Sequence, residues 1–287
     1  MCSSRRHVGV TGLKKPEHSA ECWLAYRPKV TRAILCFMAV RSENRLLAAL
    51  PRGGRQRFLL DCDHVALTLH DILAEVGEQI SHVYFPTSGL ISLTLKLDNG
   101  APLEVGIIGN EGMLGSFLTL GVSVSPQHAI VQGAGTALRM NVATFQRHCR
   151  ENANLRERLA HYVYASMRQL AQMSVCSRYH QVEARLARQL LMNRDRVGEN
   201  ELHLTHEFLA STLGVRRVGI TQAAQELQAR GLIRYSRGDI TITDGAGLET
   251  RSCECYGRAN QIYVQALGAP RTGGNSRLRP SLRGLPA

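Results

Sequence analysis

The chain has 287 residues, enough for two ordinary domains, and 44% of them are hydrophobic, which excludes wholesale disorder. Its formal net charge is +12. Residues 1–37 carry +5 of this charge and residues 268–287 carry +4, so only +3 remains for the rest of the chain. The overall charge is therefore weak evidence for nucleic-acid binding, and a motif has to support that conclusion.

No stretch approaches the roughly 18 consecutive apolar residues of a membrane span, and no apolar signal-like run follows Arg5 and Arg6. We therefore expect a cytoplasmic protein with no membrane partner. The eight cysteines form no CxxC pair and no recognisable zinc-ligand spacing, and Cys253 and Cys255 are the closest two. We interpret them as reduced thiols, with a redox or iron–sulfur role as the alternative.

Residues 1–37 show no clean period, and we predict that they are disordered or a non-native N-terminal extension, with Met38 as a candidate start. An amphipathic segment follows, with Leu46, Leu47 and Leu50 after Asn44. Short apolar runs between glycines then predict strands at residues 80–85, 90–95, 103–108, 129–131 and 136–140. In the second run, Ile91, Leu93 and Leu95 alternate with Ser92, Thr94 and Lys96, and Asp98-Asn99-Gly100 predicts a hairpin turn. Residues 38–150 are therefore predicted to be a small barrel or jelly roll.

A helical pattern begins near Val142, with a short helix around residues 145–149 and a long one over residues 154–176. Apolar residues recur along the long helix at steps of three, four or seven, and we predict that this stripe forms a dimer interface; packing against the chain's own domain is the alternative. The predicted dimerisation residues are Leu155, Leu159, Tyr162, Val163, Leu170 and Met173.

The most informative segment is residues 204–244. Thr205 is placed to cap a helix over residues 206–213, and Gly214 allows a tight left-handed turn after it. A second helix is predicted over residues 216–229. Its inner side is small and apolar, with the spacing i, i+3, i+4, i+7: Ile220, Ala223, Ala224 and Leu227.

The outer side of this second helix carries residue types that read base edges in a major groove, and they lie near the helix N-terminus. They are Arg216, Arg217, Val218, Thr221 and Gln222. After Gly231-Leu232-Ile233, an alternating hairpin with a turn at Arg237-Gly238 predicts a wing, on which Arg234 and Arg237 are available for phosphates. Five arginines against two glutamates lie between residues 205 and 238. The order of these pieces predicts a winged helix-turn-helix that binds double-stranded DNA.

In this order of elements, residues 44–248 resemble the Crp/Fnr family of bacterial regulators. The segments that carry the resemblance are residues 71–73, 77–78, 83–85, 89, 106–115, 209–214 and 231–233. The resemblance implies an α+β fold: a jelly-roll-like β-roll sensor (38–150), a dimerisation helix (151–178), a winged helix-turn-helix (179–250) and a C-terminal helix with a disordered tail (251–287). The resemblance also implies a homodimer that binds DNA, with RNA polymerase as a candidate partner. It places Arg217, Val218 and Gln222 at the positions that read bases. At the last of these positions the family commonly has Arg, which Gln222 replaces here.

The resemblance places an effector site at Glu111, Gly112, Gln127 and His128. Cyclic-nucleotide binders of the family have Arg-Ser or Arg-Thr where this chain has Gln127-His128. Losing the arginine removes a charge-assisted hydrogen bond worth roughly 1.5–3 kcal/mol, which disfavours a cyclic nucleotide. The cysteines Cys2, Cys22 and Cys36 are spaced too widely for the family's oxygen-sensing cluster, so no iron–sulfur cluster is expected. Haem is not established by His82 or His128, and the effector stays unknown.

Two other classes of protein remain. One is a small-ligand sensor module, similar to cyclic-nucleotide-binding domains, that has no DNA-binding activity. The other is an enzyme that uses Glu104, Glu111 and His128 as acid and base, but neither a nucleophile nor a phosphate-binding loop accompanies them. We expect no enzymatic activity.

Overall fold

The computed structural model describes residues 43–96, 98 and 102–268. The predictions for residues 1–37, for the turn at Asn99-Gly100 and for the tail beyond residue 268 lie outside the described residues. Two short helices come first, α1 (Arg45–Ala48) and α2 (Arg52–Leu60). The side chain of Asn44 caps α1 by accepting a hydrogen bond from the backbone N–H of Leu47. No helix within the described ranges is long and apolar enough to cross a membrane.

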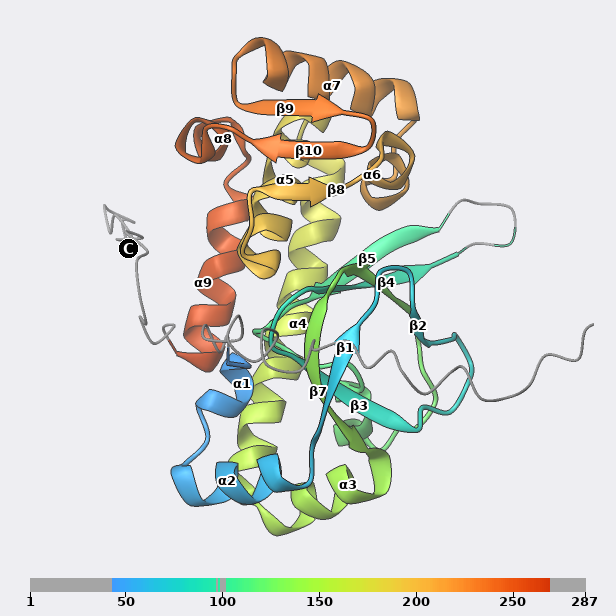
Figure 1. Cartoon of the computed structure of the whole chain (residues 1–287), viewed down its shortest axis with the longest axis vertical. Coiled ribbons are helices and arrows are strands. Elements are labelled where there is room, and N and C mark those ends of the chain that lie inside the picture. Colours follow the sequence, from blue (N-terminus) through green and yellow to red (C-terminus); the bar gives the residue numbers. More distant parts are fainter. Residues whose placement is uncertain (1–42, 97, 99–101, 269–287) are drawn as a thin grey trace, which may run out of the picture. The chain divides into compact units, whose positions relative to one another are not determined.

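Seven strands form the N-terminal part of the described chain, and we call them together the β-roll (Figure 1). One antiparallel sheet has the order β1-β7-β3 and the other β2-β6-β4-β5. The strands are β1 (Asp63–Leu67), β2 (Ile72–Ala74), β3 (His82–Pro86), β4 (Leu90–Leu95), β5 (Leu103–Ile108), β6 (His128–Gly133) and β7 (Gly135–Asn141), with a 3-10 helix, η1 (Ser116–Leu120), between β5 and β6. A strand is found at each of the five predicted ranges, with small shifts of their ends, whereas β1 and β2 were not predicted.

The alternation predicted for β4 holds only in part. Ile91 is fully buried, as expected, but Leu95 is exposed and Ser92 on the opposite face is fully buried. The cause is that both faces are covered over the first half of β4, where Ser92 donates a 2.6 Å hydrogen bond to Glu104 and Leu90 packs into the core of the C-terminal domain. A simple inward–outward alternation requires one solvated face, which this half of the strand lacks.

Two helices follow the β-roll, α3 (Val142–Glu151) and the long α4 (Ala153–Tyr179), and the C-terminal helix α9 (Cys255–Leu267) lies along α4 (Figure 1). This packing divides the predicted dimerisation stripe. Leu155, Leu159 and Tyr162 are buried in a core that includes Ile262 and Tyr263 of α9, so they contact their own chain. Val163 and Met173 are partly buried, and Leu170 is exposed.

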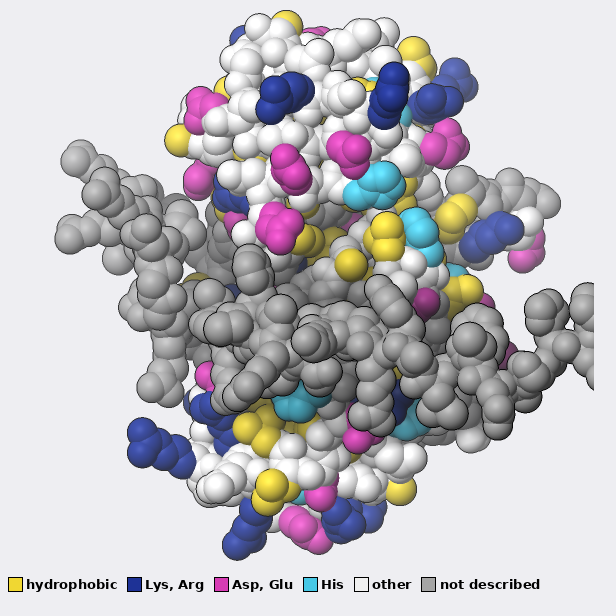
Figure 2. Space-filling model, viewed as in Figure 1, with side chains coloured by type: hydrophobic (Ala, Val, Ile, Leu, Met, Phe, Trp, Pro, Cys, Tyr) yellow, Lys and Arg dark blue, Asp and Glu magenta, His cyan; other side chains and the backbone are white. Residues whose placement is uncertain are grey.

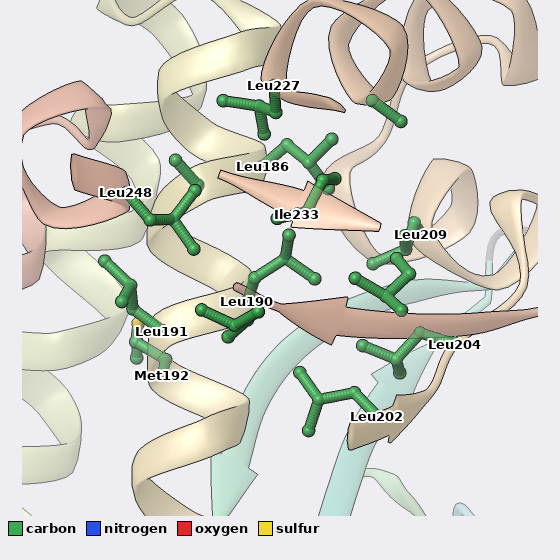
Figure 3. Packing of buried hydrophobic residues seen from close by; sticks show 14 of the residues in the cluster. Leu186, Leu190, Leu191, Met192, Leu202, Leu204, Leu209, Leu227, Ile233 and Leu248 are labelled. Carbon is green, nitrogen blue, oxygen red and sulfur yellow. The ribbon is translucent and has the colours of Figure 1, made fainter. Parts of the chain in front are cut away.

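The remaining elements form a domain that we call the winged helix (Figure 1). They are α5 (Val182–Val197), β8 (Glu201–His203), α6 (His206–Leu213), α7 (Arg217–Ala229), β9 (Ile233–Ser236), β10 (Asp239–Ile242) and α8 (Gly245–Arg251). Figure 3 shows the core of this domain, where Leu186 and Leu190 of α5 meet Leu227 of α7 and Ile233 of the wing. The sequence predicted a two-stranded wing, and the structure adds β8 as a third strand in the order β8-β10-β9.

Candidate nucleic-acid interface

The helix-turn-helix forms as its local sequence predicts. The hydroxyl of Thr205 accepts a 3.1 Å hydrogen bond from the backbone N–H of Phe208 and caps α6. Gly214 ends α6 with φ of 61°, a left-handed conformation that glycine adopts without steric cost. The chain then enters α7 with Arg216 as its N-cap residue. The turn therefore fixes where α7 begins and which side of it faces the domain.

The two sides of α7 differ as expected. Ile220, Ala223, Ala224 and Leu227 are buried in the domain core, and the small alanines let the helices approach closely. Arg216, Arg217 and Gln222 are exposed, and Val218 keeps 60% of its surface accessible. Neither arginine forms an ion pair with any residue in the described part of the chain. The outer side of α7 is thus free to meet a polyanion.

Thr221 is the predicted base-reading residue that the structure places differently. It is half-buried, and its hydroxyl donates a 3.1 Å hydrogen bond to the carbonyl of Arg217. The same hydroxyl lies 3.1 Å from Nδ1 of His206. Burial, together with the positive charge of Arg217, lowers the pKa of His206. Thr221 therefore joins α7 to a neutral histidine on α6, an internal contact that the sequence pattern did not predict.

Contacts of Tyr235 on β9 fix the wing against both α6 and α7. Tyr235 stacks on His206 with 4.0 Å between ring centroids, and its backbone N–H donates a 2.8 Å hydrogen bond to the side chain of Gln228. At the tip, Arg237 and Gly238 have φ of 51° and 96°, the backbone of a tight two-residue hairpin. Arg234 and Arg237 are exposed. Figure 2 shows dark-blue Lys and Arg side chains over the region of α7, β9 and β10.

This arrangement suits DNA. A major groove about 12 Å wide admits one α-helix, and the N-terminal residues of that helix reach the base edges. Arginine can donate two hydrogen bonds to guanine, glutamine can pair with adenine, and the valine side chain can contact a thymine methyl group. The exposed arginines of the wing are suited to phosphates beside the groove.

The predicted effector residues are not gathered in one place. Glu111 is buried and ion-paired with Arg196 of the winged helix. Gly112 lies so close to Tyr162 that an added Cβ would clash with the Tyr162 hydroxyl. Gln127 is half-buried, and Nδ1 of His128 lies 2.6 Å from a carboxylate oxygen of Glu75. Of the four residues, His128 lines a cavity between the β-roll and the winged helix.

A cavity of about 670 Å³ lies between the β-roll and the winged helix. Its volume falls within the range of small-molecule sites. The β-roll supplies polar residues such as Glu75, Glu104 and His128, and the winged helix supplies residues such as His203 and Phe208. The cavity thus touches both the predicted sensor and the element that carries α7.

Glu104 at this cavity is bonded across the two domains. It accepts hydrogen bonds from Ser92 at 2.6 Å and from Gln189 of α5 at 2.9 Å. Complete burial raises its pKa to about 7, although these two hydrogen bonds and the charges of Arg188 and Arg196 oppose the rise. A proton at Glu104 is thus exchanged near neutral pH, at a contact between the β-roll and the winged helix.

The side chains of Cys176, His180, Cys253 and Cys255 also come together, and the spacing of cysteines in the sequence gave no sign of it. The structure describes five cysteines, namely the three of this cluster together with Cys62 and Cys149, and all five are free thiols.

Comparison with known proteins agrees with this reading of the fold. Residues 184–251 match the family model for the Crp-like helix-turn-helix domain. No curated protein sequence matches the chain.

Three solved structures illustrate the likeness of fold. A transcriptional regulator of the Crp/Fnr family from Eubacterium rectale has a TM-score of 0.57 and 20% identity, covering 73% of this chain and 99% of its own. FixK2 from Bradyrhizobium japonicum has a TM-score of 0.56 and 12% identity, covering 67% and 98%. The Crp-family regulator TTHB099 from Thermus thermophilus has a TM-score of 0.55 and 17% identity, covering 66% and 96%.

The exposed arginine-led helix and its wing define a DNA-binding domain of the winged helix-turn-helix class. Residues 184–251 match the Crp-like helix-turn-helix domain, and the described chain has the fold of solved Crp/Fnr regulators.

Proposed function

We propose that the chain acts as a homodimer that reads a two-fold related DNA site with α7 in the major groove of each half-site. The observation that carries this proposal is the exposed, unpaired Arg216-Arg217 pair at the start of α7, within the described residues. Arg217, Val218 and Gln222 would contact bases, whereas Arg234 and Arg237 of the wing would contact phosphates. As a regulator of chromosomal genes it would work in the cytoplasm, and RNA polymerase is a candidate partner there.

The dimer is supported by an exposed apolar stripe on α4. Tyr164, Met167 and Leu170 are 59%, 64% and 41% exposed, and partly buried Val163 lies beside them. Val163, Met167 and Leu170 follow one another at steps of four and three, the spacing of a coiled-coil seam. Since large apolar side chains clustered on one helix face mark an interaction surface, a second α4 is the partner that fits best. Half-sites about one helical turn of DNA apart follow from a two-fold axis.

Effector control is the second part of the proposal. The cavity between the β-roll and the winged helix would take a small ligand, and Glu104 with Gln189 would transmit its presence to α5. The carboxylate of Glu75 beside His128 disfavours a cyclic phosphate there, because like charges repel. A cation or a neutral ligand with hydrogen-bond donors suits Glu75 and Glu104 better.

Genome-wide mapping of DNA bound by the full chain tests the first part. We expect an enriched two-fold motif whose half-sites are separated by about one helical turn. Binding spread over the genome without an enriched motif, or an enriched motif without two-fold symmetry, would contradict the proposal. The same mapping with Gln222→Arg should shift the preferred base at one position of each half-site and keep the spacing.

A further inference from the structure

Four potential metal ligands converge where the long helix ends. Cys176 lies in the last turn of α4, and His180, four positions later, is the residue that caps the C-terminal end of this helix. Cys253 and Cys255 come from the junction between α8 and α9, and the peptide between them directs both side chains to the same point. All four ligand atoms lie within 4.8 Å of one another.

The distances between these atoms match the edges of a small tetrahedron. Sγ of Cys176 lies 3.6 Å from Sγ of Cys253, and Sγ of Cys255 lies 3.5 Å from Nδ1 of His180. Metal–ligand bonds of about 2.3 Å to sulfur and about 2.0 Å to nitrogen give edges of about 3.8 Å and about 3.5 Å for tetrahedral zinc. The Cys176–Cys253 separation is far beyond the roughly 2.05 Å of a disulfide. The geometry is that of one ion, since an iron–sulfur cluster divides its four ligands among two or four irons and spreads them farther apart.

The groups around the four ligands are those that surround metal sites in proteins. Nε2 of His180 lies 3.1 Å from a carboxylate oxygen of Glu254, so the ring presents Nδ1 to the three sulfurs. A histidine ligand usually donates its other N–H to a carboxylate in this way. Gln172 lies one turn before Cys176 on α4 and donates a 3.0 Å hydrogen bond to Sγ of Cys255.

The local charge also favours an anionic thiolate site. Arg185 and Arg188 of α5 are only 8% and 4% exposed, and both lie close enough to Cys176 to interact with its charge. Nε of Arg188 is buried without a hydrogen-bond partner among the described residues. A divalent ion with three thiolates and one imidazole carries one net negative charge, which these buried arginines would balance.

We propose that Cys176, His180, Cys253 and Cys255 bind one zinc-like divalent cation in a tetrahedral Cys₃His site. Binding displaces the thiol protons and joins the end of α4 to the α8–α9 junction. Because α4 carries the proposed dimer stripe and α8 belongs to the winged helix, the ion fixes the point where these parts meet. The site stands on its own geometry and does not depend on the DNA-binding proposal.

Metal titration of the reduced full chain tests the site. The chain is stripped with a chelator and titrated with Zn²⁺ and, in parallel, with Co²⁺, whose thiolate charge-transfer and visible bands report tetrahedral sulfur ligation. We expect one ion per chain, loss of the Co²⁺ bands in Cys253→Ser and Cys255→Ser, and unchanged bands in the control Cys149→Ser. We also expect Zn²⁺ to raise the melting temperature of the wild type and leave that of Cys253→Ser unchanged.

A ligand variant can fail to fold, because Cys255 is completely buried. The more exposed Glu254 provides a second variant: Glu254→Gln should keep the fold and weaken Zn²⁺ binding by roughly 10- to 100-fold. No stoichiometric binding by the wild type, equal loss of binding in Cys149→Ser, or formation of an iron–sulfur cluster on these cysteines would each overturn the proposal. Undisturbed zinc binding by Glu254→Gln would overturn the role of that carboxylate.

Discussion

Nε of Arg196 lies 2.8 Å from Oε1 of Glu111, and this ion pair joins α5 of the winged helix to the loop after β5 of the β-roll. Both side chains are almost completely buried, at 7% and 5% exposure. Burial on its own would lower the pKa of Arg196, but Glu111, through its charge and its hydrogen bond, together with Tyr263 and Asp195 outweighs burial, and the pKa is raised. Glu111 also accepts a hydrogen bond from the backbone N–H of Gly109. A residue expected to bind an effector thus connects the two domains.

Replacing Glu111 by Gln should destabilise the chain. The change leaves the buried guanidinium of Arg196 without a counter-charge, a loss that costs about 3–5 kcal/mol when one partner of a buried pair is removed. Urea unfolding measures the free energy of unfolding. Glu111→Gln combined with Arg196→Met should recover most of the loss, because neither charge then remains buried. Equal stability of wild type and Glu111→Gln would show that the pair is not formed in solution.

The stability of the chain should fall as the pH rises through the range set by Glu104. The pKa of this carboxyl is about 7 in the folded chain against an ordinary value of 4.5, so the folded state holds the proton more tightly. The stability from this proton is therefore fully present below pH 4.5, falls as the pH rises from 4.5 to about 7, and is lost above that, with a difference of about 3 kcal/mol. Glu104→Gln should remove this slope and be the more stable protein at pH 8.

The comparison between wild type and Glu104→Gln isolates Glu104 from the neighbouring groups. His128 and His203 line the same cavity and are present in both proteins, so the difference between the two proteins reports Glu104 alone. Unfolding free energies from pH 5 to 8.5 give the two curves. Parallel curves would mean that Glu104 is not buried as described.

The contrast between the DNA-binding segment and the metal cluster shows what the sequence could predict. The cap at Thr205, the turn at Gly214 and the inner face of α7 depend on residues a few positions apart, and each was predicted and found. Cys176 and Cys253 are 77 positions apart, and only the packing of α9 along α4 brings them together. The same packing buries Leu155 and Leu159 inside their own chain. The spacing of apolar residues along one helix does not distinguish such residues from those that face a second chain.

Introducing charge into the α4 stripe should separate the dimer. Met167→Glu places a carboxylate at the two-fold seam of the proposed interface, where it would meet its own copy, so the chain should run as a monomer in light scattering. Leu60→Glu is the matched control, since Leu60 of α2 is 80% exposed and far along the chain from the stripe. Because Met167 and Leu60 are both exposed on the single chain, neither substitution should change the melting temperature of the monomer. A wild type that is monomeric with and without DNA would refute the dimer.

The wing arginines should contribute affinity without sequence preference. Arg234→Ala and Arg237→Ala should each weaken binding to specific and unrelated DNA by a similar factor and lower the slope of log affinity against log salt by about 1. Arg217→Ala should instead cost about 1–3 kcal/mol on the preferred site and relax the choice of base at one position. Fluorescence anisotropy across a salt series separates these outcomes. An Arg234→Ala protein with altered base preference would contradict the assignment of the wing to phosphates.

The central claim is that the outer side of α7 meets DNA through Arg216 and Arg217, and charge reversal tests it most directly. The measurement is the affinity of the double variant Arg216→Glu/Arg217→Glu for the mapped site, beside the control Arg57→Glu at an exposed position of α2. We predict that the double variant folds as the wild type does and loses detectable specific binding, while Arg57→Glu binds normally. Wild-type affinity in the double variant would contradict the account.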